Sequence, residues 1–177
     1  YESLAGRAAD IADRTYELCH FLTDICGISD AAEALGSYFP HTVAYHPSCH
    51  GMRILRLGDR QRDLLASVEG LELAEIQNES ECCGFGGTFA VKNPAISGAM
   101  LGDKTEAIVS TNAEVCSGGD VSCLMHIGGG LSRTRRLIPA ESNAPATVHL
   151  ARILASTKEE PLMVPAEGAT VTGGALR

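Results

Sequence analysis

The chain has 177 residues, the length of one domain or of one domain with a small annex, and 45% of them are hydrophobic, enough to build a core. Fourteen lysines and arginines stand against twenty-two aspartates and glutamates, and the resulting net charge of −8 disfavours nucleic-acid binding. No apolar run reaches the length of a membrane span, and the first residues do not resemble a secretory signal. The chain opens on Tyr1 and not on methionine, so we expect a fragment of a longer protein.

Residues 1–40 are predicted to form an amino-terminal helical segment. Apolar residues recur at intervals of three and four, which indicates one amphipathic helix over residues 4–26 that ends at Gly27. Cys19 and Cys26 lie seven residues apart on its apolar face. Both are therefore expected to pack in the core.

Helical and extended patterns then alternate along the chain. The predicted elements are a short helix over 29–38, a strand over 42–46, a helix over 52–68 interrupted near Gly58, a strand over 71–76, a polar, glycine-rich loop over 79–88, a helix over 94–109, a strand over 114–116, a helix from Ser122, and a strand or helix start over 147–150. The helix from Ser122 either stops at the glycine run 128–130 or bends there and continues.

This alternation predicts an α/β fold, a Rossmann-like parallel sheet with flanking helices, over residues 41–157. In such sheets, binding sites form in the strand-to-helix loops at the carboxyl ends of the strands. Residues 158–177 contain two prolines and three glycines and are predicted to be a flexible tail.

Seven cysteines, an odd number spread along a chain with ample apolar residues, do not indicate a disulfide scaffold. Reduced thiols in a cytoplasmic protein are core residues, metal ligands or catalytic groups, and we expect this chain to be cytoplasmic. Cys49, Cys82, Cys83 and Cys123 each follow a predicted strand, so they are expected to converge at one edge of the sheet.

The paired cysteines Cys82 and Cys83 lead into a glycine-rich stretch over 84–87. Iron–sulfur clusters need several thiolates and closely approaching backbone N–H groups, and glycines permit that approach. The stretch does not complete a dinucleotide-binding motif, which disfavours nucleotide binding.

Three loops of the sequence, residues 46–50, 82–89 and 120–129, resemble the cysteine-rich CCG domain family. This domain occurs in one of the heterodisulfide reductase subunits, in glycolate oxidase iron–sulfur subunits and in lactate-utilisation proteins, and the residues of the loops are most similar to the lactate-utilisation branch. The resemblance covers about residues 42–156. Family members normally carry two such modules in tandem, and this chain resembles the carboxy-terminal one.

The resemblance implies an oxidoreductase subunit. It would transfer electrons through iron and sulfur within a complex that oxidises L-lactate, a 2-hydroxy acid, to pyruvate. The implied partners are the other iron–sulfur subunits of that complex, and a homo-oligomer is a further candidate assembly. The resemblance assigns no catalytic residue in this chain.

The resemblance also implies the ligands. Cys49, Cys82, Cys83 and Cys123 match the family pattern, whereas Asp120 stands where the first cysteine of the last pair is expected. Four thiolates suit a [4Fe–4S] cluster or, as the alternative, tetrahedral zinc. Additional candidate ligands are Asp120, Cys116 and His50; Asp120 is equally typical of a helix N-cap, and Cys116 of a buried strand residue. The histidines that flank the cysteine loops are candidates to bind metal or to donate hydrogen bonds to sulfur: His46, His50 and His126.

Two other functions compete with electron transfer. In one, zinc stabilises a structural module used for subunit assembly. In the other, Cys82 or Cys83 exchanges with a disulfide, as in a heterodisulfide reductase.

Overall fold

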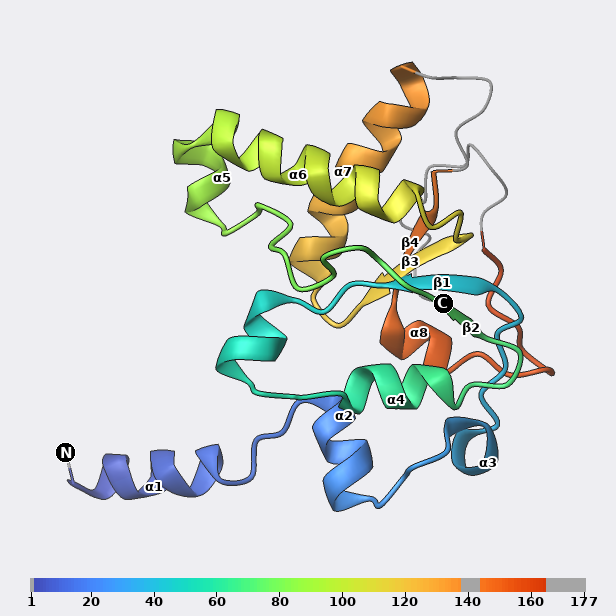
Figure 1. Cartoon of the computed structure of the whole chain (residues 1–177). Coiled ribbons are helices and arrows are strands. Elements are labelled where there is room, and N and C mark those ends of the chain that lie inside the picture. Colours follow the sequence, from blue (N-terminus) through green and yellow to red (C-terminus); the bar gives the residue numbers. More distant parts are fainter. Residues whose placement is uncertain (1, 138–143, 165–177) are drawn as a thin grey trace.

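The computed structural model describes residues 2–137 and 144–164 and confirms the α/β fold (Figure 1). Its elements in chain order are α1 Glu2–Ala12, α2 Leu18–His20, the π-helical turn η1 Phe21–Ile25, α3 Ala31–Leu35, β1 Thr42–Tyr45, the π-helical turn η2 His50–Ile54, α4 Arg60–Ala66, β2 Glu72–Ala74, α5 Thr88–Lys92, α6 Pro94–Val109, β3 Val115–Gly118, α7 Val121–Leu137, β4 Ala146–His149 and α8 Leu150–Leu154. Within the described residues, no helix combines the length and apolar character that crossing a bilayer requires.

The sheet has four parallel strands in the order β2-β1-β3-β4. The chain therefore goes from β1 to one neighbour, β2, and then returns to the other side of β1 to form β3. The connections that follow β1 and β3 lead to strands on opposite sides, so the topology changes direction between the carboxyl ends of these two strands. This point in the topology is where ligands bind in open α/β sheets.

Helices cover both faces of the sheet, as the alternation of side chains along the central strands requires (Figure 1). Val43 and Tyr45 of β1 pack in one apolar cluster with residues of α2, α4 and α8. Ala44, between them in sequence, packs on the opposite face in a second cluster with residues of α6 and α7, and this cluster also contains Cys83 and Cys123. Two of the predicted site residues are thus part of the packed interior.

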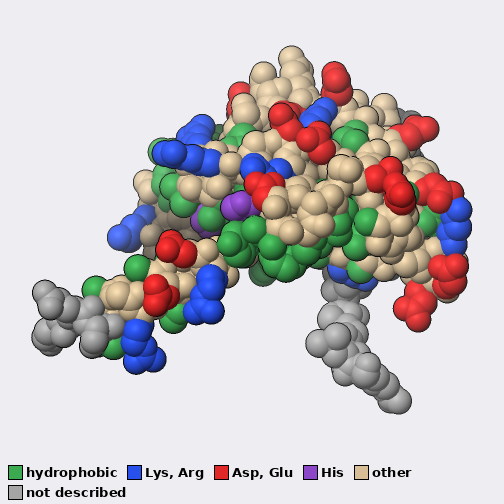
Figure 2. Space-filling view, turned by 90° about the horizontal axis from the view of Figure 1, so that it is seen from below, with side chains coloured by type: hydrophobic (Ala, Val, Ile, Leu, Met, Phe, Trp, Pro, Cys, Tyr) green, Lys and Arg blue, Asp and Glu red, His purple; other side chains and the backbone are tan. Residues whose placement is uncertain are grey.

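The single helix predicted over residues 4–26 is wrong, because the structure divides this segment into α1, α2 and η1. Glu17 has an extended backbone, and its carboxylate accepts hydrogen bonds from the backbone N–H groups of Cys19 and His20. This cap starts a new helix at Leu18 and changes the direction of the chain. Helix α1 then projects from one side of the molecule (Figure 2), and all its described side chains are exposed.

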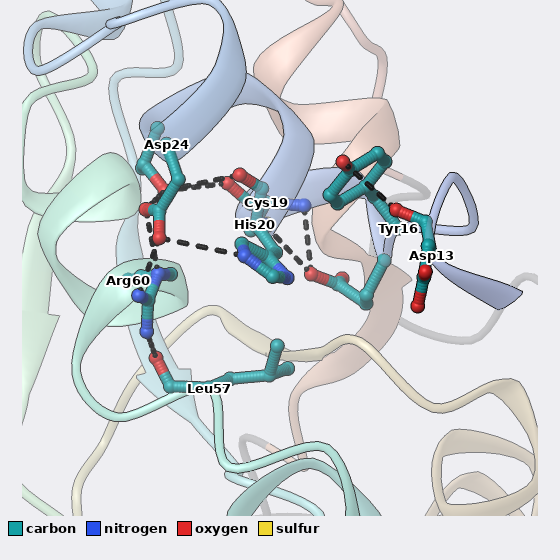
Figure 3. Close-up of polar contacts among 9 residues, drawn as sticks. Asp13, Tyr16, Cys19, His20, Asp24, Leu57 and Arg60 are labelled. Carbon is teal, nitrogen blue, oxygen red and sulfur yellow. Dashed lines mark hydrogen bonds and ion pairs between the residues drawn. The ribbon is translucent and has the colours of Figure 1, made fainter.

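Cys19 is buried, as predicted, but Cys26 is exposed, contrary to the prediction. The π-helical turn η1 rotates the chain relative to an α-helix, and Cys26 ends it just before Gly27, whose φ is +70°. Asp24 fixes η1 to α4 through two hydrogen bonds from Arg60, at 2.8 and 2.6 Å (Figure 3).

The glycine run at 128–130 lies inside α7, so the helix continues through it, as one of the two predicted alternatives has it. A Cβ on Gly128 would lie 3.0 Å from the Thr147 hydroxyl of β4, and one on Gly130 would lie 2.8 Å from Thr105 of α6. The glycines therefore permit α7 to pack closely against both neighbours.

The flexible tail predicted over 158–177 falls partly outside the described residues, which end at 164. Before that point, Leu162 and Val164 pack against the first apolar cluster. The backbone N–H of Leu162 also donates to the Ser156 hydroxyl.

Candidate metal centre

Four cysteines lie in the three loops that follow β1, β2 and β3. Cys49 immediately precedes η2, Cys82 and Cys83 lie between β2 and α5, and Cys123 lies in the first turn of α7. The parallel strands direct all three loops to the same edge of the sheet. The convergence predicted from the spacing of strands and cysteines is therefore present in the fold.

The most compact part of the site consists of His46, Cys83 and Cys123. One ligand atom from each, a ring nitrogen or a sulfur, lies within 4.8 Å of the other two. All three side chains are buried, with exposed fractions of 1%, 1% and 6%. Neither ring nitrogen of His46 has a hydrogen-bond partner in the described residues, although an unsatisfied buried polar group is costly. This imidazole is thus oriented toward two sulfurs and lacks any other polar contact.

Cys49 and Cys82 form a second pair beside this set, and both are partly exposed. Burial raises the pKa of Cys82, the backbone N–H of Gly84 opposes the rise, and the neighbouring Cys49 thiol adds to it. The Cys49 and Cys83 thiols also interact electrostatically with Cys123. All four sulfur atoms therefore belong to one network, in which the inner pair is buried and the outer pair is open to solvent.

The pKa values of the inner pair, Cys83 and Cys123, are shifted in opposite directions. A hydrogen bond from the Cys123 thiol lowers the pKa of Cys83 from 9.0 to about 4, against burial, and the neighbouring His46 side chain and the Phe85 backbone act in the same direction. The same hydrogen bond and burial raise the pKa of Cys123. Cys83 is therefore a thiolate at neutral pH, the form that binds metals and attacks disulfides.

Glycines shape the loop that carries Cys82 and Cys83. Gly84 has a φ of +87°, and a Cβ there would lie 2.7 Å from the Ser97 carbonyl oxygen of α6. The backbone N–H of Gly84 lies 3.4 Å from the Cys82 sulfur, to which it donates. A larger residue would push the loop away from α6 and disturb this N–H donor.

Side chains of α6 and α7 contact the loop that carries Cys82 and Cys83. The Ser97 hydroxyl donates to the Gly84 carbonyl oxygen at 2.8 Å and lies 3.4 Å from Nε2 of His126. The His126 ring in turn contacts Phe85, with 5.7 Å between ring centroids. His126 is therefore engaged with the scaffold and lies outside the compact ligand set.

The backbones of β1 and β3 approach each other closely at their carboxyl ends. The backbone N–H of His46 donates to Ser117 at 2.7 Å, and a Cβ on Gly118 would lie 2.7 Å from the His46 carbonyl oxygen. Nε2 of His149 lies 3.2 Å from the Gly119 carbonyl oxygen, which ties β4 to this turn. Glycine at 118 thus lets His46 sit next to the loop that leads to Cys123.

The additional candidates occupy other positions. Asp120 caps α7: its Oδ1 accepts hydrogen bonds from the backbone N–H groups of Ser122 and Cys123 and from the Ser122 hydroxyl. Burial opposes ionisation of Asp120, but these hydrogen bonds hold its pKa below the usual range. The other oxygen, Oδ2, lies 3.9 Å from Nδ1 of His50, whose side chain is 57% exposed.

Cys116 is fully buried on β3, and burial raises its pKa to about 12. Like Asp120 and His50, it lies outside the compact set.

The sequence offered His46, His50 and His126 alike as candidates and named His50 among the additional ligands, whereas in the structure His46 lies next to Cys83 and Cys123. The distinguishing signal was present in the sequence, because His46 directly follows the apolar strand 42–45 and Pro47 stops that strand. A histidine at the carboxyl end of a central parallel strand lies where this fold binds ligands. His50, four residues later, lies beyond the edge of the sheet.

Residues 43–128 match the sequence pattern of a family described as a cysteine-rich domain, CCG. Among characterised proteins, the chain is similar to lactate utilization protein A of Oceanobacillus iheyensis, with 42% identity over 152 residues, and of Shouchella clausii, with 41% over 150 residues. It is also similar to lactate utilization protein A of Bacillus subtilis, with 39% identity over 153 residues. These alignments include 85–86% of this chain but 58–59% of each relative, so the chain spans less than two thirds of the relatives' length.

Proposed function

The chain belongs to the cysteine-rich CCG domain family, and we propose that it is the cofactor-holding module of a lactate-utilisation protein. The observation that carries the proposal is the convergence of four thiols at the carboxyl edge of the sheet with one buried imidazole, whose ring nitrogens have no hydrogen-bond partner among the described residues. The names of the similar proteins support lactate utilisation as the process it serves. In this proposal, the module transfers electrons between lactate, which is oxidised to pyruvate, and partner iron–sulfur subunits.

The proposed ligands are Cys49, Cys82, Cys83 and Cys123, with His46 as a fifth donor. The site fits a thiolate-bound centre for two reasons. The His46 ring nitrogens are buried without hydrogen bonds, a cost that coordination would remove. In addition, the backbone N–H groups of Gly84 and Phe85 point at cysteine sulfurs, as is typical of cluster sites.

We propose a [4Fe–4S] cluster as the group held here; when bound, such a cluster accepts and releases single electrons. The residues of this chain bind and orient it through thiolates at the ends of three strands. The burial of Cys83 and Cys123 excludes water from the inner side of the site. The N–H donors and the solvent exposure of the outer pair then set its reduction potential.

Zinc is the second candidate, and one observation favours it. The ligand atoms of His46, Cys83 and Cys123 lie within 4.8 Å of one another, close to the separation of roughly 4 Å between ligands of a tetrahedral zinc ion. In this case Cys49 or Cys82 would complete the four-coordinate site, and the module would serve subunit assembly without electron transfer.

Thiol–disulfide chemistry is the third candidate, favoured by the thiolate character of Cys83 beside Cys123. Oxidation of the Cys83 thiolate and the Cys123 thiol would form one disulfide bond and pass two electrons and one proton to a disulfide substrate, which would take a second proton from water and be reduced to two thiols.

One experiment separates the three candidates. Protein prepared anaerobically is analysed for iron, sulfide and zinc and is measured by absorption and electron paramagnetic resonance spectroscopy. The proposal predicts about four irons and four sulfides per chain, with broad absorbance near about 400 nm. One zinc and no colour would contradict the cluster and support the assembly role. Metal-free protein that exchanges thiols with a small disulfide would support the third candidate.

A further inference from the structure

Lys104 is a buried cation close to the candidate site. It lies on the inward face of α6, and its exposed fraction is 1%. Its ammonium group donates hydrogen bonds to two backbone carbonyl oxygens, those of Asn78 and Glu79, both at 3.1 Å. Among the described residues it forms no ion pair: the Glu79 carboxylate pairs with Arg62 instead, and Glu81 is exposed.

Such a lysine is energetically unusual. Lysine is almost never fully buried unless its charge is paired, because removing an ammonium ion from water costs several kcal/mol. Two carbonyl oxygens satisfy two of its three donors but supply no negative charge. Burial accordingly lowers the pKa of Lys104, and nearby acidic groups oppose this effect, Glu81 first and then Cys116, Cys83 and Glu79. In the metal-free protein, the negative charge near Lys104 therefore comes from groups that form no ion pair with it among the described residues.

The surroundings of Lys104 link it to the cysteines. Leu101 and Ile108, one helical turn away on either side, pack in the same apolar cluster as Cys83 and Cys123. The carbonyl groups that Lys104 binds lie in the segment just before Cys82. Ser97, two turns earlier on α6, holds the Gly84 carbonyl on the other side of the pair. Helix α6 thus holds the cysteine loop on both sides of the Cys82–Cys83 pair, through the Lys104 ammonium group on one side and the Ser97 hydroxyl on the other. Of these two groups, only the ammonium is charged.

We propose that Lys104 is a positioning residue whose ammonium group anchors the Cys82–Cys83 loop and supplies the counter-charge of the thiolate-bound centre. The inference rests on the proposed function, because a thiolate-rich, net negative centre would add negative charge near a buried cation that forms no ion pair among the described residues. In the metal-free protein the cation costs stability, and in the loaded protein it stabilises the bound state.

The test uses Lys104→Met, which removes the charge but keeps an unbranched side chain. Zinc affinity is measured by competition with a chelator, and stability by urea unfolding of the reduced, metal-free protein. We expect the affinity for zinc to fall about tenfold or more, in the range known for residues that support metal ligands. We expect the metal-free variant to be at least as stable as the wild type. Zinc affinity would then fall while metal-free stability stays the same or rises, whereas loss of a purely structural lysine would lower stability.

Two further variants separate charge from hydrogen bonding, and they also cover the case in which Lys104→Met does not fold. Lys104→Arg keeps the charge and should retain most of the affinity, whereas Lys104→Gln keeps a donor without charge and should behave like methionine. Lys92→Met, the same substitution at an exposed lysine of α5, is the matched control and should bind zinc like the wild type.

The inference is overturned if Lys104→Met, or Lys104→Gln in its place, binds zinc within about twofold of the wild type. It is also overturned if affinity and metal-free stability fall together, or if arginine and glutamine have equal effects. These results would leave the proposed function intact. A wild-type chain that binds neither zinc nor iron would overturn both.

Discussion

His46 is the residue that most clearly marks the site as a place for a ligand. Both nitrogens of this buried imidazole lack hydrogen-bond partners in the part of the chain that the structure describes, so the group loses hydrogen bonds that it would have in water, at a cost of about 1–3 kcal/mol. Two cysteine sulfurs lie next to it, and a bound metal would recover that loss. The folded protein is therefore preorganised for coordination at the expense of its own stability.

His46→Leu tests this reading. We expect the affinity for zinc or iron to fall about 10- to 100-fold, while the metal-free variant is as stable as the wild type or more so, since an unsatisfied polar group is removed. Chelator competition and urea unfolding measure the two quantities. His50→Leu is the control, because His50 is exposed and outside the compact set, and it should keep wild-type affinity within about twofold. A larger loss for His50→Leu than for His46→Leu would reverse the assignment.

Cys83 should give the metal-free protein a pH-dependent stability. Its folded pKa of about 4 lies below its unfolded value of 9.0, so its contribution is fully present above pH 9.0 and is lost as the pH falls toward 4. We expect the difference in unfolding free energy between wild type and Cys83→Ser to shrink steadily over this range. We also expect one thiolate, seen by its ultraviolet absorbance at about 240 nm, to persist in the wild type near about pH 6. Loss of this signal between pH 8 and 9 would contradict the thiolate assignment.

Residue-level reasoning from the sequence identified the four cysteines but not the role of each histidine. The cysteines were identifiable because each follows a strand, and parallel strands end at the same edge. The position of His46 directly after the apolar strand 42–45 favours a site residue, but the orientation of its imidazole depends on packing. His46 points inward because β1 continues its hydrogen bonding to β3 through the His46 backbone.

At the level of elements, the parallel strands and the long helix α6 were predictable, and the amino-terminal segment was not. The prediction of a helix over 94–109 matches α6, which proline begins. The predicted helix over 4–26 failed because a capping interaction by Glu17 competes with helix continuation. The periodicity of apolar residues does not reveal whether a side chain such as Glu17 caps a new helix or lets the preceding one continue.

The loop after β2 offers a test at this scale. Gly84→Ala would bring a methyl group 2.7 Å from the Ser97 carbonyl oxygen in a backbone region that favours glycine. We expect a loss of about 1–3 kcal/mol in unfolding free energy and a clear loss of bound metal, because the loop must move away from α6. Gly98→Ala, one residue after Ser97 on the open side of α6, meets nothing within 4 Å and should stabilise the protein by up to about 1 kcal/mol. Equal effects of the two substitutions would contradict the packing account.

At the scale of the whole molecule, we propose from the packing that the folded module begins close to the start of α2. The predicted division at residue 40 separates a helical segment from the module, yet Cys19, Ala31 and Phe39 are buried in the first apolar cluster. The structure thus integrates these residues with β1, α4 and α8. By contrast, the side chains of residues 4–12 in α1 are all exposed.

Truncation tests this boundary. Removing residues 1–12 should change the melting temperature by less than about 2 °C and leave the metal content unchanged, since the side chains of residues 4–12 are all exposed. Removing residues 1–40 should unfold the protein or lower its melting temperature by more than about 10 °C, because three core side chains are lost. Differential scanning calorimetry measures both. A stable protein after the longer deletion would support the division at residue 40.

The proposed function depends above all on four sulfur atoms from three loops sharing one inorganic centre, and a cysteine scan of anaerobically prepared protein examines this point. Metal content per chain is measured for single serine variants of Cys49, Cys82, Cys83 and Cys123, and for control variants at Cys19, Cys26 and Cys116, with folding checked by circular dichroism. We expect each of the four site variants to lose most of the bound metal, whereas the three controls should keep the wild-type amount. Wild-type metal content in any folded variant of the four, or an equal loss in the exposed Cys26 variant, would show that the sulfurs do not share a centre.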